Sequence, residues 1–220
     1  MLNRFRKLYK GYSLLLDWRG ARRSLRGDVP TKHEELGAMS TVNTDYKVLK
    51  QIFKTKKHYL SDCKVFCDVG CGKGRVINYL LINGFSGKII GIELDEYVAK
   101  FTKEWSRRFK NVTIINNNVL NIDCLNSIDV FYLYNPFNKS VLEAFVDKLE
   151  MESKHRIRII YCNALYPEVF NRPNWTLLDN FQVTTNYIDW GNICHTVLIV
   201  EMNGIVSVLS NKDNSSLCDC

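Results

Sequence analysis

Apolar residues follow two periods along most of this chain. From about residue 41 to residue 162, short continuous apolar runs alternate with segments in which apolar residues recur every three or four positions, the spacings of buried strands and amphipathic helices. The pattern predicts strands at 64–69, 88–93, 112–116, 128–134 and 156–162, and helices at 41–57, 74–83, 96–109 and 139–152. We expect Thr44 or Ser40 to cap the first helix. Strands that alternate with helices predict a parallel sheet.

The pattern changes after Tyr166-Pro167. Residues 175–185 and 192–202 alternate apolar and polar positions with no helical segment between them, which predicts an antiparallel pair joined through Asp189-Trp190-Gly191. The expected fold is therefore α/β, with a seven-stranded, mostly parallel sheet, one antiparallel edge strand, and helices on both faces.

Charge is concentrated at the start of the chain. The 220 residues suit one domain, and no apolar run approaches the ~20 residues of a membrane span. Residues 1–33 carry nine Lys and Arg against Asp17 and Asp28, which accounts for the whole net charge of +7. We therefore divide the chain into a basic arm (1–40), a neutral body (41–205) and a polar tail (206–220).

The basic arm has a helical apolar pattern of its own, formed by Leu2, Phe5, Leu8, Tyr9, Tyr12, Leu15 and Leu16. A basic amphipathic helix is typical of contact with nucleic acid or with an anionic membrane. It can equally dock on the body and leave its charges in water. Both interpretations of residues 1–33 stay open at this point.

The cysteines indicate a reducing compartment. None of the eight forms a C-x-x-C pair, and Cys67 and Cys162 fall in predicted buried strands, where a free thiol behaves as a small hydrophobe. We expect a cytoplasmic protein without structural disulfides. The four histidines have no metal-ligand spacing, so no metal site is predicted. The sequence leaves the role of Cys218 and Cys220 in the polar tail open.

The strongest chemical signal is the turn after the first predicted body strand, Phe66-Cys-Asp-Val-Gly-Cys-Gly-Lys-Gly-Arg75. Three glycines in alternate positions allow positive φ angles and a close approach of the backbone to a ligand. Glu93 follows 19 positions after Gly74, at the end of the next strand. A carboxylate there is placed to accept hydrogen bonds from ribose hydroxyls, so this βαβ unit is predicted to bind a nucleoside.

The order of the acidic residue and the glycines restricts which nucleoside ligands fit this site. A dinucleotide site has the pattern G-x-G-x-x-G and a pyrophosphate, which Asp68 would repel; a nicotinamide-dependent oxidoreductase is therefore the weaker alternative. The D-x-G-x-G-x-G pattern resembles the first motif of the class I S-adenosylmethionine (SAM)-dependent methyltransferases. It is similar to small bacterial members with D-x-G-C-G-K-G-R and Y-N-P-F motifs. The resemblance implies a Rossmann-like fold, SAM as cofactor, and cofactor contacts from Asp68, Gly70, Cys71, Gly72, Gly74, Glu93 and Leu94.

A third strand end carries Asn116-Asn117-Asn118-Val119. In the family this position usually offers an acid to the adenine amino group, followed by a small or apolar residue. Asn118 and Val119 are the matching residues, with one position of uncertainty in the register. Asn118 differs from the usual Asp, but its side-chain carbonyl accepts the same hydrogen bond.

The fourth strand end carries Tyr134-Asn135-Pro136-Phe137. It resembles the N/D-P-P-Y/F motif of enzymes that methylate amino or amide nitrogen, although it has one proline. The resemblance assigns catalysis to Asn135, Pro136 and Phe137: the amide oxygen and a following carbonyl accept hydrogen bonds from the target N–H, and the ring stacks on a planar target. Asn135 is also expected to contact the cofactor.

The expected function is SAM-dependent methyl transfer, with nitrogen slightly favoured as the acceptor atom. The acceptor itself, a small molecule or an exposed group on protein, glycan or RNA, is not specified. Direct displacement needs positioning rather than a metal, and a base only where the acceptor must lose a proton. His33, in a lid or in a solvated loop, and Asn163 are the candidates near the acceptor. The alternative is an inactive SAM-fold module that docks on RNA or a membrane through the basic arm.

Overall fold

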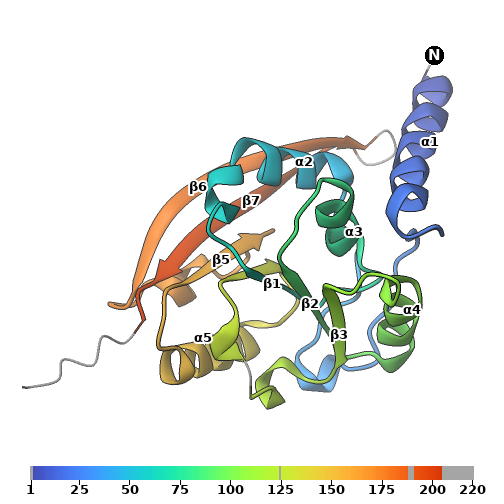
Figure 1. Ribbon diagram of the computed structural model, residues 1–220. Coiled ribbons are helices and arrows are strands. Elements are labelled where there is room, and N and C mark those ends of the chain that lie inside the picture. Colours follow the sequence, from blue (N-terminus) through green and yellow to red (C-terminus); the bar gives the residue numbers. More distant parts are fainter. Residues whose placement is uncertain (1, 124, 188–190, 205–220) are drawn as a thin grey trace, which may run out of the picture.

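The computed structural model describes residues 2–123, 125–187 and 191–204, with the side chains of residues 11–123, 125–185 and 193–204 (Figure 1). Its helices are α1 (Leu2–Gly20), α2 (Tyr46–Thr55), α3 (Arg75–Ile82), α4 (Glu96–Ser106) and α5 (Lys139–Glu152). Its strands are β1 (Val65–Val69), β2 (Lys88–Glu93), β3 (Val112–Asn116), β4 (Val130–Tyr134), β5 (Ile157–Cys162), β6 (Trp175–Tyr187) and β7 (Gly191–Met202). The predicted alternation of strands and helices is confirmed.

One sheet contains all of these strands, in the order β3-β2-β1-β4-β5-β7-β6. The first five strands in this order are parallel to one another, whereas β7 is antiparallel to both β5 and β6. The prediction of a mostly parallel sheet with antiparallel pairing at one edge is thus confirmed. The reversed strand lies second from that edge, because β7 turns back from β6 and pairs with β5 on its other side.

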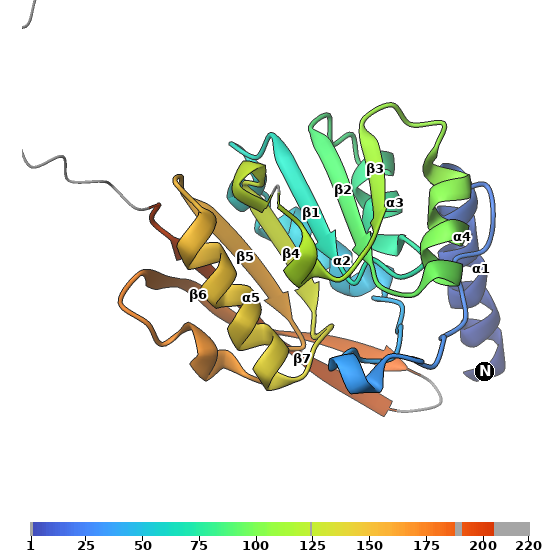
Figure 2. The ribbon, with the colours of Figure 1, turned by 90° about the horizontal axis from the view of Figure 1, so that it is seen from below.

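Helices cover both faces of the sheet, as predicted (Figure 2). On one face α2, α3 and α4 pack against side chains such as Phe66 and Tyr132; on the other, α5 packs against Phe131 and Ile159. The central strands are buried on both faces, which explains why they appear in the sequence as continuous apolar runs. Cys67 and Cys162 are fully buried free thiols, in agreement with the sequence prediction.

The first body helix is shorter than predicted. It begins at Tyr46 rather than at residue 41, and Asp45, not Thr44 or Ser40, is the cap: its side chain accepts a hydrogen bond from the Lys47 N–H at 2.7 Å. Residues 36–44, which we call the strap, run along the carboxyl ends of the strands instead. Their backbone pairs with distant segments, through bridges between Val29 and Thr41 and between Ala38 and Phe137.

The second half of α1 packs on the body. Gly20 lies so close to α3 that a Cβ atom there would meet the side chains of Asn78 and Ile82. Asp17 is fully buried and accepts hydrogen bonds from the Tyr46 hydroxyl at 2.7 Å and from the Leu25 N–H at 3.1 Å. Docking of the helix on the body, one of the two interpretations of the arm, therefore holds for these residues.

No helix in the described part of the chain combines the length and apolarity needed to cross a bilayer. The proposed link Asp189-Trp190 and the polar tail, with Cys218 and Cys220, lie outside the described residues.

Candidate functional site

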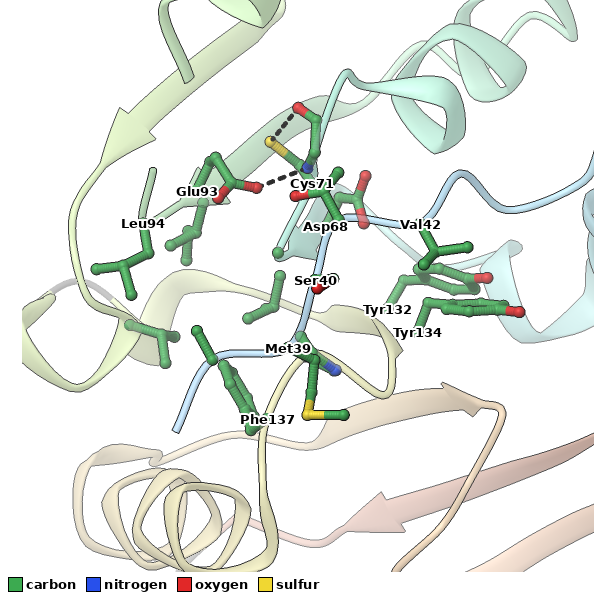
Figure 3. Close-up of a pocket in the computed structure, with 18 of the residues that line it drawn as sticks. Met39, Ser40, Val42, Asp68, Cys71, Glu93, Leu94, Tyr132, Tyr134 and Phe137 are labelled. Atoms are coloured by element: carbon green, nitrogen blue, oxygen red, sulfur yellow. Dashed lines mark hydrogen bonds between the residues drawn. The ribbon is translucent and has the colours of Figure 1, made fainter. Parts of the chain in front are cut away.

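A cleft opens at the carboxyl ends of β1, β2 and β4, the edge of an open α/β sheet at which ligands bind. Figure 3 shows Asp68 and Glu93 on one side of it, with Met39 and Phe137 opposite. Leu94 lies at one end of the cleft and Tyr134 at the other. The cleft is therefore acidic on one side and apolar on the opposite side.

The glycine turn has the geometry that its pattern predicts. Gly70, Gly72 and Gly74 have φ angles of 70°, 52° and 81°, in the region that side chains disfavour. The N–H groups of Gly70 and Cys71 both donate to the Ile92 carbonyl at 2.9 Å, which folds the turn over the end of β2. Gly70, Cys71 and Gly72 line the cleft, whereas Gly74 packs away from it, against the Trp105 side chain.

Glu93 is held in position by two backbone donors. One carboxylate oxygen accepts from the Gly72 N–H at 2.8 Å and the other from the Asp95 N–H at 3.0 Å. The side chain is only 6% exposed, and burial raises its pKa although these N–H groups counteract the shift. Each oxygen keeps a lone pair, so the group can accept the two ribose hydroxyls that the sequence assigns to it.

Asp68 is the most unusual group in the cleft. It is 3% exposed, and its Oδ2 atom has no hydrogen-bond partner among the described residues. Burial, together with the nearby Glu93 carboxylate, raises its pKa well above the ordinary value. An unpaired buried carboxylate favours a cation, and SAM carries both an ammonium and a sulfonium. The two acidic side chains of the cleft, Asp68 and Glu93, thus fit the positively charged SAM, whereas a pyrophosphate would add negative charge beside two carboxylates.

Arg75 is a lining residue that the sequence analysis did not assign. It occupies the first position of α3 and lines the same cleft as Asp68. Its Nε atom lies 3.6 Å from the buried Asp17 carboxylate. Asp68 and Arg75 together match the ammonium and carboxylate of an amino acid, which is the methionine end of SAM. The sequence signal that could have identified Arg75 is its place as the last residue of the D-x-G-C-G-K-G-R motif.

The predicted adenine residues also lie at the cleft. Asn118 and Val119 line it together with Asn117 and with Leu94, which was predicted as a cofactor contact. The Asn118 Oδ1 atom accepts a hydrogen bond from the Leu120 N–H at 3.0 Å and so caps a short helical turn. A carbonyl oxygen has a second lone pair, which remains for a ligand amino group.

Only part of the Asn135-Pro136-Phe137 turn lies at the cleft. Pro136 and Phe137 line the cleft, whereas Asn135 is not among the described lining residues and is 6% exposed. Its backbone is left-handed, with φ at 42°, and its Oδ1 atom accepts from the Tyr161 hydroxyl at 2.8 Å. The Pro136 carbonyl accepts from the Met39 N–H of the strap at 3.0 Å.

The strap closes the cleft and was the main omission of the sequence analysis. Eight of its residues line the cleft: Leu36, Ala38, Met39, Ser40, Thr41, Val42, Asn43 and Thr44. Its position depends on long-range backbone pairing, for which no local sequence signal exists. Neither His33 nor Asn163 is among the described lining residues.

A second omission is the pair formed by Tyr134 and His195. Tyr134 lines the cleft at the end of β4, and its hydroxyl lies 3.2 Å from Nδ1 of His195 on β7. Burial lowers the pKa of His195, partly offset by Asp45, so the ring is neutral near pH 7. The Tyr134 end of the cleft thus contains an imidazole hydrogen-bonded to a lining phenol.

Gly72→Ala tests the close packing of the strap against the glycine turn. A Cβ atom at Gly72 would lie 2.6 Å from Cγ2 of Thr41, and its φ of 52° is strained for alanine. We expect the variant to lose about 1–3 kcal/mol of unfolding free energy, measured by chemical denaturation. Adding Thr41→Ser removes the clash but not the backbone strain, so part of the loss should return. Equal losses in the single and the double variant would contradict this packing.

Comparisons with known proteins agree with this geometry. The family described as "Methyltransferase domain" matches residues 60–169, half of the chain. A protein of Invertebrate iridescent virus 6 named "Putative methyltransferase 235L" is 30% identical over 79 residues, which are 35% of this chain and 30% of that protein. The chain thus matches less than a third of the length of this curated relative.

Solved structures show the same fold at low identity. An RNA methyltransferase from Salinibacter ruber, in complex with S-adenosyl-L-homocysteine (SAH), has a TM-score of 0.54 and 16% identity, covering 79% of this chain and 100% of its own. A SAM-dependent methyltransferase from Methanosarcina mazei has a TM-score of 0.55 and 10% identity, covering 68% and 97%. With the family match and a cleft whose charges fit SAM, these findings lead to one conclusion: this chain belongs to the SAM-dependent class I methyltransferases.

Proposed function

We propose that the protein transfers a methyl group from SAM to a nitrogen atom of its acceptor. The observation that carries the proposal is the position of the Asn135-Pro136-Phe137 turn. It follows β4, whose Tyr132 pairs with Asp68 in the sheet register, so it lies beside the part of the cleft that suits the methionine end of SAM.

SAM supplies an electrophilic methyl group, and the protein contributes orientation. Glu93 would hold the ribose, and Asp68 and Arg75 would hold the charged ends of the methionine portion. Well-aligned reacting groups can lower a barrier by up to ~7–11 kcal/mol. The remaining wall of the cleft, from Phe137 to Tyr134, would orient the acceptor.

Tyr161 prepares Asn135 for this role. The tyrosyl hydroxyl occupies one lone pair of the amide oxygen and leaves the other for an acceptor N–H. The second expected carbonyl, that of Pro136, is bound to the strap through Met39. Under this proposal the strap therefore moves when the acceptor binds, which releases that carbonyl and gives the acceptor access to Asn135, a residue that does not line the closed cleft.

A panel of small acceptors tests the proposal. Full-length protein is incubated with SAM and with compounds that offer amino, amide, hydroxyl, carboxyl or thiol groups, and SAH formation is measured. We expect turnover with nitrogen acceptors, including nucleosides with exocyclic amino groups. Turnover with hydroxyl acceptors alone would contradict the nitrogen assignment. SAM binding without turnover on any acceptor, including cell extracts, would favour the inactive binding module.

Asn135 variants provide the residue-level prediction. We expect Asn135→Ala and Asn135→Gly to reduce kcat by about 100-fold, because an oriented hydrogen-bond acceptor is lost at the reacting nitrogen. Glycine is the matched control for backbone strain, since it tolerates the φ of 42°. Asn135→Asp keeps an oxygen acceptor and should retain more activity. A loss of SAM affinity equal to the loss of kcat in all three variants would argue against a catalytic role.

A further inference from the structure

The outer side of α1 exposes three large apolar residues in one row. Tyr12, Leu15 and Trp18 are 46%, 66% and 54% exposed, and their three-residue spacing places them along one side of the helix. Arg19, also exposed, lies on this side near the end of the helix, and the exposed Arg22 follows two residues beyond that end. We call these five residues the outer stripe.

The opposite side of the helix is fixed to the body, so the outer stripe stays turned outward. Ser13 and Asp17 are buried, and Gly20 packs on α3. Asp17 is the one acidic residue in the α1 sequence, and it faces inward, toward Tyr46 and Arg75. The solvent side of α1 therefore carries no carboxylate to offset its basic residues.

The chemistry of the stripe favours a lipid surface over RNA. Leu15, the most exposed of the three apolar residues, can neither stack on a base nor form a hydrogen bond, but it gains by entering hydrocarbon. Tyr and Trp are the side chains typical of the bilayer interface, and arginine attracts anionic headgroups. We propose that α1 docks this protein on an anionic phospholipid bilayer, with Leu15 and Trp18 in the interface and Arg19 and Arg22 at the phosphates.

Vesicle flotation with the full-length protein tests this proposal without SAM, so its outcome is independent of methyl transfer. We expect binding to vesicles of phosphatidylcholine mixed with phosphatidylglycerol, weaker binding to pure phosphatidylcholine, and a decrease with added salt. Leu15→Asp should lower the partition coefficient by about tenfold or more, because the leucine no longer enters the interface. Arg19→Gln with Arg22→Asn should lower it mainly at low salt; asparagine tolerates the φ of 54° at residue 22.

The matched control is Met151→Asp, which places the same charge at a similarly exposed apolar residue on α5, 74% exposed against 66% for Leu15. Figures 1 and 2 both show α5 far from α1. This control should bind vesicles like the wild type, and all variants should keep the wild-type Tm. Equal loss in Met151→Asp and Leu15→Asp would overturn the proposal. So would salt-sensitive binding to an RNA oligonucleotide combined with no binding to anionic vesicles.

Discussion

Glu93→Ala is expected to weaken SAM binding by at least about 100-fold. The two ribose hydroxyls lose hydrogen bonds to a charged acceptor, worth about 1.5–3 kcal/mol each, and 1.4 kcal/mol corresponds to a factor of ten in Kd. The substitution also removes the oxygen that accepts from the Gly72 N–H, so the glycine turn loses an anchor. Isothermal titration calorimetry with SAM and with SAH measures the effect, and both ligands should lose affinity because both contain the ribose.

Two further variants separate ribose binding from a general loss of structure. Glu96→Ala removes an exposed carboxylate three residues away, in the first turn of α4, and should leave Kd unchanged. Glu93→Gln keeps the shape of the side chain but turns an NH₂ group toward one of two backbone donors, so its Kd should lie between wild type and Glu93→Ala. If Glu93→Ala binds SAM within about threefold of wild type, the ribose is bound elsewhere.

Asp68→Asn is expected to stabilise the ligand-free protein and to remove most of its affinity for SAM. In the free protein the Asp68 carboxylate is buried, has an unsatisfied oxygen, and lies near Glu93, so its ionised form is unfavourable. The amide has no charge to bury and therefore raises the free energy of unfolding at neutral pH. The same change removes the negative charge that the SAM cation needs, so SAM should no longer raise Tm.

The pH dependence follows from the raised pKa of Asp68. The folded protein binds this proton more firmly than the unfolded chain does. Asp68 therefore makes its full contribution to the free energy of unfolding below its unfolded pKa, and this contribution is lost as pH rises through its folded pKa. SAM requires the ionised form, so its affinity should fall as pH drops through the folded pKa. The pKa of Glu93 is also raised, so the Asp68→Asn variant should keep a smaller pH dependence.

Thermal unfolding with and without SAM, measured across pH, checks both halves of this prediction. In a domain of this size, ~1 kcal/mol of unfolding free energy appears as about 2–4 °C in Tm. Asp129→Asn is the control, because Asp129 lies at the amino-terminal edge of the sheet, where it accepts hydrogen bonds from the Lys64 and Val65 N–H groups; its loss should lower Tm and leave SAM binding intact. A lower Tm in ligand-free Asp68→Asn would contradict our account of its buried carboxylate.

Much of the candidate cofactor site could be predicted because its residues are close together in the sequence. Asp68, the glycine turn and Glu93 belong to one βαβ unit, in which strand ends and turn residues meet by the geometry of a parallel pair. Arg75 was present in the same motif, but its contact with the cleft depends on the direction of α3, and the pattern does not specify that direction. The helix at 41–57 was predicted too long for a related reason: the apolar residues of the strap fit a helical period but serve the cleft.

The sequence alone determined which segments along the chain form strands and helices, the class of cofactor, and the unequal distribution of charge. These depend on the period of apolar residues, on turn chemistry and on composition, all of which act over a few residues. Only the tertiary structure decided that the strap lies over the cleft, that Tyr161 holds Asn135, that His195 reaches Tyr134, and which side of α1 faces the solvent. Each of these joins segments far apart in the chain, and their pairing is determined by the packing of the whole fold.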